Sequence, residues 1–443
     1  MKKILIVAEF FAPNNKIASV RTTKLAKYFK LNGYYVGVIS RKLRNTESID
    51  PTLLKELNYV DEHIIVGDSW IMRQVFWIYN KLKKTEVRKK TINNTTFKPN
   101  ETNISAVLSP FFRKISSDFY NFYTTKAYSK RAKKQVEKTC RQYDVILTSS
   151  GPFSADILGR LAKITNPNIL WIADFRDPPP TDFLLKKHLP YYNWLQNEVV
   201  KNASAIIGVS DSCIECFKDG FKREIITICN GFDEDDINNI ETINGNEFAL
   251  TYAGMLYNGE RDLSIIFKAI SELIMESKID KTKIVVNYLG NDVVSFLEQA
   301  DAYNMQTICQ TFGKVDREKS LQMQLSSHIL LLASWNKTGN TGIITGKFFE
   351  YMMINKPIVC SIMGNLPNSM LKEMITEANN GVVWEQANDE TDYPIMKEYI
   401  LKQYKQYEQG LPLHFTPNEK YINQFRYKKI ANKFIEIINF ISR

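Results

Sequence analysis

Hydrophobic and polar positions alternate along this chain in a way that predicts strands and helices in turn. An apolar run at 4–7 is followed by a polar loop, by an amphipathic helix at 20–31, and by a second apolar run at 35–39. Short apolar runs of about four to eight residues fit buried strands, whereas apolar residues three and four positions apart fit one face of a helix. This order is typical of a parallel sheet with crossover helices.

The same alternation returns in two longer series, which we interpret as two domains. The first resumes with "DVILTSSGP" and a helix at 155–165, followed by the strands in "ILWIAD", "AIIGVS" and "IITICNG". The second contains the strands in "FALTYAG", "KIVVNYLG", "TICQTFG", "HILLLAS" and "PIVCSI". We therefore predict an α/β protein with two Rossmann-like domains. The predicted boundaries are 1–236 for the N-terminal domain, 237–247 for a linker, 248–414 for the C-terminal domain and 415–443 for a helical crossover.

The stretch "TGIITGKFFEYMMINKPIVCS" carries charges at the start of a predicted buried helix. Thr345 and Gly346 make a helix entry, and Lys347 and Glu350 then share one face near the positive end of the helix. An ion pair between the two side chains is one interpretation. The other is an anion site at the helix N-terminus, with the carboxylate accepting hydrogen bonds from a diol. A nucleoside diphosphate presents an anion beside a ribose diol.

Basic residues are concentrated in one segment. Of the 58 lysines and arginines, 15 lie at 71–135 with only 3 acidic residues, a net charge of +12, so the rest of the chain carries −2. Aromatic residues are interleaved with these charges, namely Trp70, Phe76, Trp77, Tyr79, Phe111, Phe112, Phe119 and Tyr120. We predict that residues 70–134 dock on an anionic membrane surface. The alternative is that the aromatics pack on the N-terminal sheet while the lysines face solvent. Nucleic acid is not expected as a partner, because no nucleic-acid motif accompanies the charge.

Other features of the sequence indicate the cellular compartment and bear on metal binding. No apolar stretch approaches the roughly 18 residues that span a bilayer, and "MKKILIVAEFF" lacks the long apolar run and cleavage site of a signal peptide. The six cysteines form no paired framework, which fits a reducing compartment. The acidic run in "FDEDD" fits a first helical turn better than a metal site. We expect a cytoplasmic protein without a metal site.

Seven motifs, in order, carry a resemblance to a known family. They are "KILIVAEFFAP", "SSGPF", "ADFRDPPP", "VSDSCIECF", "NGFDEDD", "YAGMLYNGERDLSII" and "GIITGKFFEYMMINKPI". In these the chain resembles glycosyltransferase family 4, of the GT-B architecture, and especially its bacterial surface-polysaccharide subgroup. The resemblance implies two Rossmann-like domains facing each other across a cleft, with the C-terminal helix packing back on the N-terminal domain.

The resemblance also implies a reaction: a sugar moves from a nucleotide donor to an acceptor, with retention of anomeric configuration. The expected substrate is a nucleotide sugar, a UDP-sugar in particular, and no cofactor is expected. The acceptor would be a glycan or a lipid-linked glycan in the synthesis of capsule, O-antigen or exopolysaccharide at the inner face of the plasma membrane. Fixed cationic side chains, in place of a metal ion, would stabilise the negative charge that develops on the departing diphosphate.

Carried over by position, the motifs assign roles to individual residues. The donor would be bound by Gly254, Arg261, Gly313, Val315, Thr345, Gly346, Lys347 and Glu350. Asp156, Asp174, Arg176 and Asp177 are the candidates for catalysis, and Asn14, Asn15, Lys16 and Arg21 for the acceptor side. For the "ADFRDPPP" loop there is an alternative to a role in catalysis: an arginine and an aspartate pair inside the protein and hold the turn in place, which we call an internal brace. Gly342 stands where many members of the family carry a glutamate that contacts the sugar, so the donor sugar is left open.

Two other functions are compatible with the same sequence. A nucleotide-sugar epimerase on this architecture would interconvert free nucleotide sugar without any acceptor. A non-catalytic partner subunit with a glycosyltransferase-like fold would lack turnover, and the joint presence of Arg261, Lys347 and Glu350 argues against it.

Overall fold

The structure is a computed structural model of the chain. It describes all residues except 46, 71, 75, 77–103, 178–185, 244, 258, 340, 342 and 343, and it describes residues 104–120 and 186 by their backbone alone. The described chain forms two compact units, unit 1 (Met1–Cys229 with Ala431–Arg443) and unit 2 (Asn230–Ile430). Gly342, Trp77 and Tyr79, named above, lie outside the described residues.

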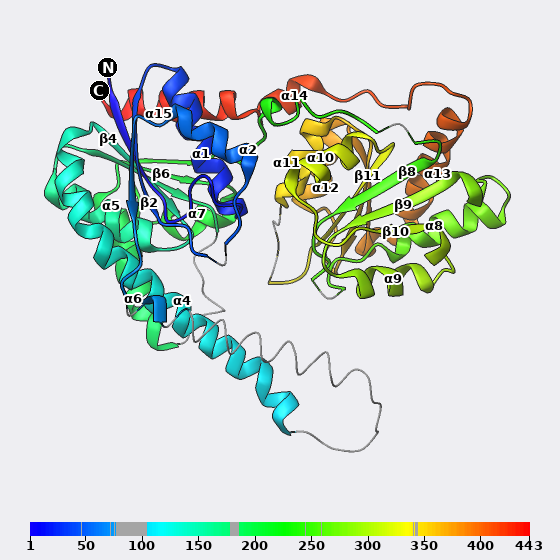
Figure 1. Cartoon of the computed structure of the whole chain (residues 1–443), viewed down its shortest axis with the longest axis horizontal. Coiled ribbons are helices and arrows are strands. Elements are labelled where there is room, and N and C mark those ends of the chain that lie inside the picture. The colour runs from blue at the N-terminus through cyan, green and yellow to red at the C-terminus, as the bar shows by residue number, and fades with distance from the viewer. Residues whose placement is uncertain are drawn as a thin grey trace. The chain divides into compact units, whose positions relative to one another are not determined.

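Unit 1 is built on a sheet of parallel strands in the order β3-β2-β1-β4-β5-β6-β7 (Figure 1). The strands are β1 (Lys3–Val7), β2 (Tyr35–Arg41), β3 (Glu62–Val66), β4 (Val145–Ser150), β5 (Leu170–Phe175), β6 (Ala205–Gly208) and β7 (Glu224–Thr227). Its helices include α1 (Ile17–Leu31), α2 (Pro51–Leu54), α4 (Ile104–Thr139), α5 (Ser154–Thr165), α6 (Leu189–Asn202), α7 (Asp211–Lys218) and most of α15 (Tyr427–Ile441).

Unit 2 repeats the plan with parallel strands in the order β10-β9-β8-β11-β12-β13. The strands are β8 (Phe248–Ala253), β9 (Ile284–Leu289), β10 (Cys309–Thr311), β11 (Ile329–Trp335), β12 (Ile358–Met363) and β13 (Gly381–Glu385). The helices are α8 (Ser264–Met275), α9 (Val293–Asp301), α10 (Arg317–Leu325), α11 (Gly346–Ile354), α12 (Met370–Ala378), α13 (Asp389–Glu408) and α14 (Glu419–Asn423).

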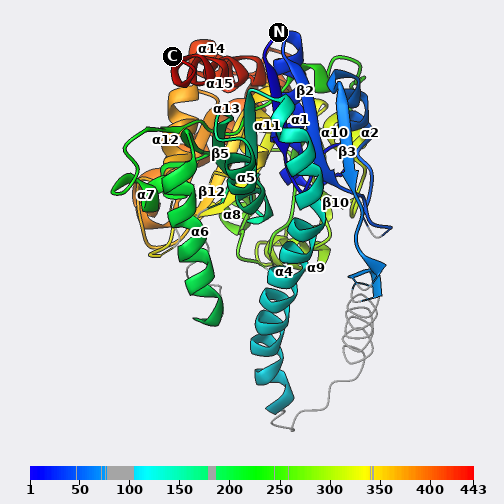
Figure 2. The same ribbon diagram turned by 90° about the vertical axis from the view of Figure 1, so that its left-hand side faces the viewer.

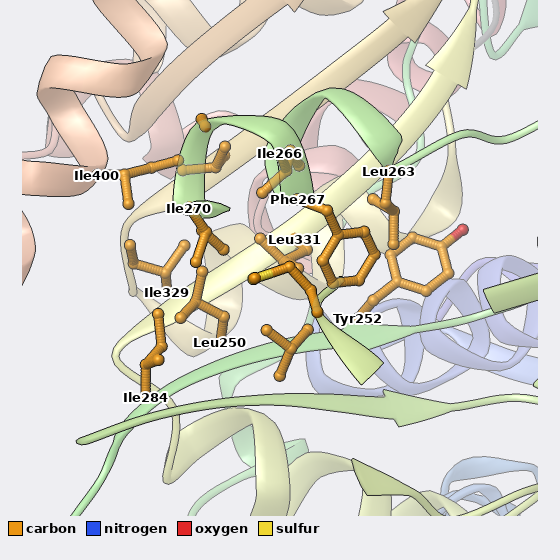
Figure 3. Close-up of a cluster of buried hydrophobic side chains, with 14 of the residues drawn as sticks. Leu250, Tyr252, Leu263, Ile266, Phe267, Ile270, Ile284, Ile329, Leu331 and Ile400 are labelled. Atoms are coloured by element: carbon orange, nitrogen blue, oxygen red, sulfur yellow. The ribbon is translucent and has the colours of Figure 1, made fainter. Parts of the chain in front are cut away.

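The core of unit 2 shows why these residues form a layered fold. Apolar side chains of the central strands, such as Leu250 and Leu331, meet Ile266 and Ile270 from α8 (Figure 3). All four side chains are essentially excluded from water. Burial of a Leu or Ile side chain contributes about 1.5–3 kcal/mol, so this layer holds the helix on the sheet.

The C-terminal helix packs on unit 1, as predicted. Helix α15 lies on unit 1 (Figure 1). Phe434 of α15 is fully buried, and its ring centre lies 6.2 Å from that of Phe29 in α1. At the end of the helix, Lys2 Nζ donates to the side chain of Asn439 at 3.1 Å.

Comparison with the sequence predictions shows agreement in the centre of each sheet and omissions at the edges. Every strand named in the sequence analysis is present, which confirms the two Rossmann-like domains. The edge strands β3 and β13 were not predicted. In both sheets the strand order reverses direction beside the first strand, at β1/β4 and at β8/β11, and such switch points are where open α/β sheets bind ligands. That the two units face each other across a cleft, and where the domain boundaries lie, stay predictions.

Helix α4 contains much of the basic segment. It packs on α5 (Figure 2), and Phe122 lies buried against His188 with ring centres 3.8 Å apart. Phe76 is also buried, beneath the Arg44 guanidinium, whereas Trp70 is 67% exposed. Among the described residues, no helix is long and apolar enough to cross a membrane.

Candidate functional site

The loop after β8 holds a cation at the switch point of unit 2. Arg261 lies with its guanidinium carbon 4.7 Å from the ring centre of Tyr257 and 5.6 Å from that of Trp335, which ends β11. One nitrogen donates to the carbonyl of Met255 at 3.4 Å, and the buried Nε has no partner among the described residues. The structure pairs no described carboxylate with Arg261. Its charge therefore stays available to a ligand.

Gly254 begins this loop at the carboxyl end of β8. Its φ of +158° is one that L side chains rarely adopt, and its N–H donates to the Leu289 carbonyl at 2.9 Å. A Cβ added at Gly290 would stand 2.2 Å from the Gly254 carbonyl oxygen. Two glycines thus let the backbone after β8 and the backbone after β9 approach each other closely.

Helix α11 begins beside the same strand ends. Its N-cap is Thr345, whose hydroxyl is buried and has no described partner. The Tyr351 hydroxyl fixes the helix, because it donates to the Leu331 carbonyl at 3.0 Å and accepts from the Ala253 N–H at 3.3 Å. In the first turn the Phe348 N–H donates to the Thr345 carbonyl at 3.0 Å. The N–H groups of Gly346 and Lys347, at the positive end of the helix, make this end a favourable place for an anion.

Glu350 is held between two cations. Lys347 Nζ lies 2.7 Å from one carboxylate oxygen, and Arg317 lies 3.2 Å from the other. Burial acts to raise the pKa of Glu350, but Lys347 and Arg317 outweigh it and hold this pKa at about 2. The ion pair that the sequence offered as one interpretation is therefore present, and Glu350 is an ionised acceptor fixed in place.

Arg317 is a residue that the sequence analysis missed. It starts α10 and bridges Glu350 to Asp236, whose carboxylate lies 3.0 Å away. Asp236 belongs to the short helical turn Glu234–Asp236, which Asp233 caps, as expected for the acidic run. Arg317 lies 33 positions from Glu350 and 81 positions from Asp236 in the sequence, so no local sequence pattern predicts either contact.

Gly313 and Val315, two of the residues predicted to bind the donor, lie between β10 and α10. Gly313 adopts a φ of +64° in this loop. Val315 packs against a small cluster formed by Ala253 at the end of β8, Leu289 at the end of β9 and Met323 of α10. The structure therefore brings Val315 to the strand ends that carry Gly254.

Unit 1 contains a cavity of about 640 Å³ at the carboxyl ends of β1, β4 and β5, which we call the unit 1 cavity. Residues after β1, the turn after β4, α4 and α6 line it. The charged residues of the lining are Glu9, Lys16, Arg44, Glu47, Asp156 and Asp177. Three of these, Lys16, Asp156 and Asp177, were predicted from the sequence, whereas Glu9, Arg44 and Glu47 were not assigned a role.

Two carboxyl groups in this cavity are removed from bulk water. Burial raises the pKa of Asp156 from 3.8 to about 7, and its described partner is the hydroxyl of Ser150. Burial also raises the pKa of Glu9, although Arg41 and the hydroxyl of Ser154 act in the opposite direction. Perturbed carboxyl groups in a concave site are typical of functional sites.

The residues predicted for the acceptor side have different surroundings. Lys16 lines the cavity, and its Nζ lies 3.0 Å from Glu47. Asn14 is buried and its side-chain oxygen accepts from the Lys16 N–H at 3.0 Å, while the side chain of Asn15 donates to Ser48. The two asparagines thus shape the loop that carries Lys16.

Arg21 and Asp174 form a brace inside unit 1. They make two hydrogen bonds of 2.8 and 2.9 Å, and both are nearly inaccessible to solvent. Arg21 also donates to the carbonyls of Ile228 and Cys229. This geometry favours the internal brace over direct contact with a substrate. Arg176 braces the same region through the carbonyls of Ala18 and Gly151.

Comparison with solved structures decides the fold. The chain superposes on HepE from Anabaena, solved with UDP and glucose, with a TM-score of 0.57 and 13% identity, covering 99% of this chain and 100% of that chain. Sucrose-phosphate synthase from Thermosynechococcus elongatus gives a TM-score of 0.56 and 11% identity over 100% and 99%. The chain has the GT-B fold.

The GT-B fold is shared by proteins of more than one activity. A proposed UDP-N-acetylglucosamine 2-epimerase from Listeria monocytogenes gives a TM-score of 0.52 and 10% identity over 99% and 96%. By sequence alone, the chain matches no protein-family profile and no curated protein. Membership of family 4 therefore stays a prediction, whereas the GT-B architecture is confirmed.

Proposed function

We propose that this protein is a glycosyltransferase that moves a sugar from a UDP-sugar to a glycan or lipid-linked acceptor, with retention and without a metal, in the synthesis of a bacterial surface polysaccharide. The GT-B fold supports the reaction class. The similarity to HepE, solved with UDP and glucose, supports the donor class. In this proposal unit 2 binds the donor and unit 1 the acceptor.

The observation that carries the proposal is the group of charges at the switch point of unit 2. Arg261 offers a guanidinium without a described carboxylate partner, and the start of α11 offers the Thr345 hydroxyl, which has no described partner, beside the N–H groups of Gly346 and Lys347. Both are suited to a diphosphate. Glu350 offers an ionised carboxylate one turn along, to which a ribose diol can donate. As the diphosphate departs, Arg261 would stabilise the negative charge that develops on it.

The test is calorimetric titration with UDP, GDP and ADP. Arg261→Met should weaken UDP binding by about 10- to 100-fold, because a charge-assisted hydrogen bond is worth about 1.5–3 kcal/mol. Glu350→Gln should weaken it as well, because an amide accepts weaker hydrogen bonds than a carboxylate. Lys268→Met and Glu373→Gln are the matched controls, since Lys268 also lies over an aromatic ring and Glu373 is an exposed helical glutamate. Unchanged UDP affinity in both site variants would refute the donor site.

An epimerase is the second candidate, favoured by the similarity to the Listeria protein. The two are separated by incubating the protein with UDP-sugars in the absence of an acceptor. Interconversion of free nucleotide sugar would support the epimerase. Release of UDP only when an acceptor is added would support the transferase, and binding of UDP without any turnover would support a non-catalytic subunit.

We also propose that the basic segment docks the protein on an anionic membrane, which would bring it to a lipid-linked acceptor. A groove of about 610 Å³ between β3 and α4 supports this, because Lys130, Arg131 and Lys134 line it without any carboxylate. Each basic residue near an anionic surface contributes about 1 kcal/mol. The burial of Phe76 and Phe122 shows that some of the aromatics pack on the protein instead.

Co-sedimentation with liposomes tests the docking. The protein should bind vesicles that contain phosphatidylglycerol at low salt and release them as salt rises. Replacement of Lys130, Arg131 and Lys134 by glutamine should weaken binding. Equal recovery with neutral and anionic vesicles would contradict the proposal.

A further inference from the structure

The walls of the unit 1 cavity are unusually aromatic for a site that also holds charges. Aromatic side chains that line it are Phe10, Phe76, Phe153, Phe175 and Tyr192. Phe153 and Tyr192 are in contact, with ring centres 5.0 Å apart. Apolar walls with a few polar groups are the usual form of a site for a small ligand or a small part of a larger one.

The cations of the lining are already neutralised. Lys16 lies 3.0 Å from the Glu47 carboxylate and 3.8 Å from the ring centre of Phe10. Arg44 holds Asp68 through two hydrogen bonds of 2.7 and 3.2 Å. Neither cation is left to balance a negative ligand.

Two acids of the lining, in contrast, have no cationic partner among the described residues. Asp156 is 4% exposed and its described hydrogen bond comes from the hydroxyl of Ser150. Asp177 is exposed, and its carboxylate lies beside Gly151, where an added Cβ would stand 2.7 Å from it. No described residue forms an ion pair with Asp177. A ligand in this cavity therefore faces carboxyl groups with spare acceptor capacity.

We propose that the unit 1 cavity binds a sugar-like group that carries hydroxyl or ammonium donors and no negative charge, with Asp156 and Asp177 accepting its hydrogen bonds. The proposal rests on the proposed sugar transfer and adds the chemical class of the group that unit 1 receives. The aromatic walls would cover the apolar faces of the ring. A uronic acid or another anionic sugar would meet two carboxyl groups and no free cation, which is unfavourable.

The experiment compares three p-nitrophenyl glycosides that differ in one substituent, derived from glucose, glucosamine and glucuronic acid. Binding to the full chain is titrated by ligand-observed NMR, and UDP binding is measured on the same samples by calorimetry. The variants are Asp156→Asn and Asp177→Asn, with Asp219→Asn as the control, because Asp219 is an exposed acid of unit 1 outside the lining. Asp177 is exposed, so its variant tests the discrimination without any change to the buried part of unit 1.

The glucoside and the glucosaminide should bind, and the glucuronide should bind at least about tenfold more weakly. Each site variant should reduce this discrimination at least about threefold, and Asp219→Asn should leave it unchanged. The inference is overturned if the glucuronide binds as well as the glucoside, if no glycoside binds, or if neither site variant alters the discrimination. If the protein still binds UDP in any of these cases, the proposed function stands although the inference fails. If the protein does not bind UDP, that result counts against the proposed function and not against the inference.

Discussion

Replacement of Asp156 by asparagine is expected to stabilise unit 1 at neutral and alkaline pH. Asp156 is buried beside the unit 1 cavity, and desolvation raises its pKa from 3.8 to about 7. Because the folded chain holds this proton more tightly than the unfolded chain, the free energy of unfolding of the wild type falls as the pH rises from about 4 to about 7. Asparagine is nearly isosteric with aspartate and does not ionise, so the free energy of unfolding of the variant does not fall with pH for this reason.

The magnitude follows from the shift. About three pKa units at 1.36 kcal/mol each give about 4 kcal/mol above pH 7. Water that enters the cavity lowers the desolvation, so about 4 kcal/mol is an upper figure, and we expect a gain of at least about 1 kcal/mol. For a unit of this size, each kcal/mol raises Tm by about 2–4 °C.

The assay is urea unfolding of the wild type and the variant from pH 4 to pH 8.5. Trp171 is fully buried in the core of unit 1 and contributes a fluorescence signal from this unit. The gain should be close to zero at pH 4 and reach its maximum above pH 7, and Asp219→Asn should show no such trend. A variant that is equally stable or less stable at pH 8 would refute the reasoning, because Asp156 would then be stabilised in its ionised form.

Three further predictions concern the other charged groups. Arg317→Met should weaken UDP binding several-fold and raise the pKa of Glu350, which calorimetry from pH 4 to pH 8 would detect; an unchanged UDP affinity over this range would show that Lys347 alone positions Glu350. Arg21→Met should destabilise unit 1 by about 3–5 kcal/mol, because it leaves Asp174 charged and unpaired in the core, and a loss below 1 kcal/mol in urea unfolding would contradict the internal brace. Turnover should survive EDTA, because fixed cations act on the diphosphate, and its restoration by Mn²⁺ after loss would count against this.

The local structure of both sheets could be predicted from the sequence. Thr345 stands at the N-terminus of α11 as predicted, and Asn355 follows the helix in the left-handed conformation, at φ 58°, that ends many helices. The pairing of Lys347 with Glu350 was also among the predicted alternatives. These features depend on residues within about one turn of one another, so the order of side chains along the chain is enough to specify them.

The tertiary structure alone decided which charges meet. Arg21 and Asp174 are 153 positions apart and pair because α1 and the end of β5 lie at the same end of the sheet. Glu9 and Asp156 follow different strands, yet they line one cavity because the carboxyl ends of parallel strands meet at one edge. The sequence named Asp174 and Asp156 as candidates of equal standing. Folding pairs Asp174 with a buried cation, whereas Asp156 lies at the wall of a cavity with a hydroxyl as its described partner. This difference in surroundings separates an internal brace from a candidate site.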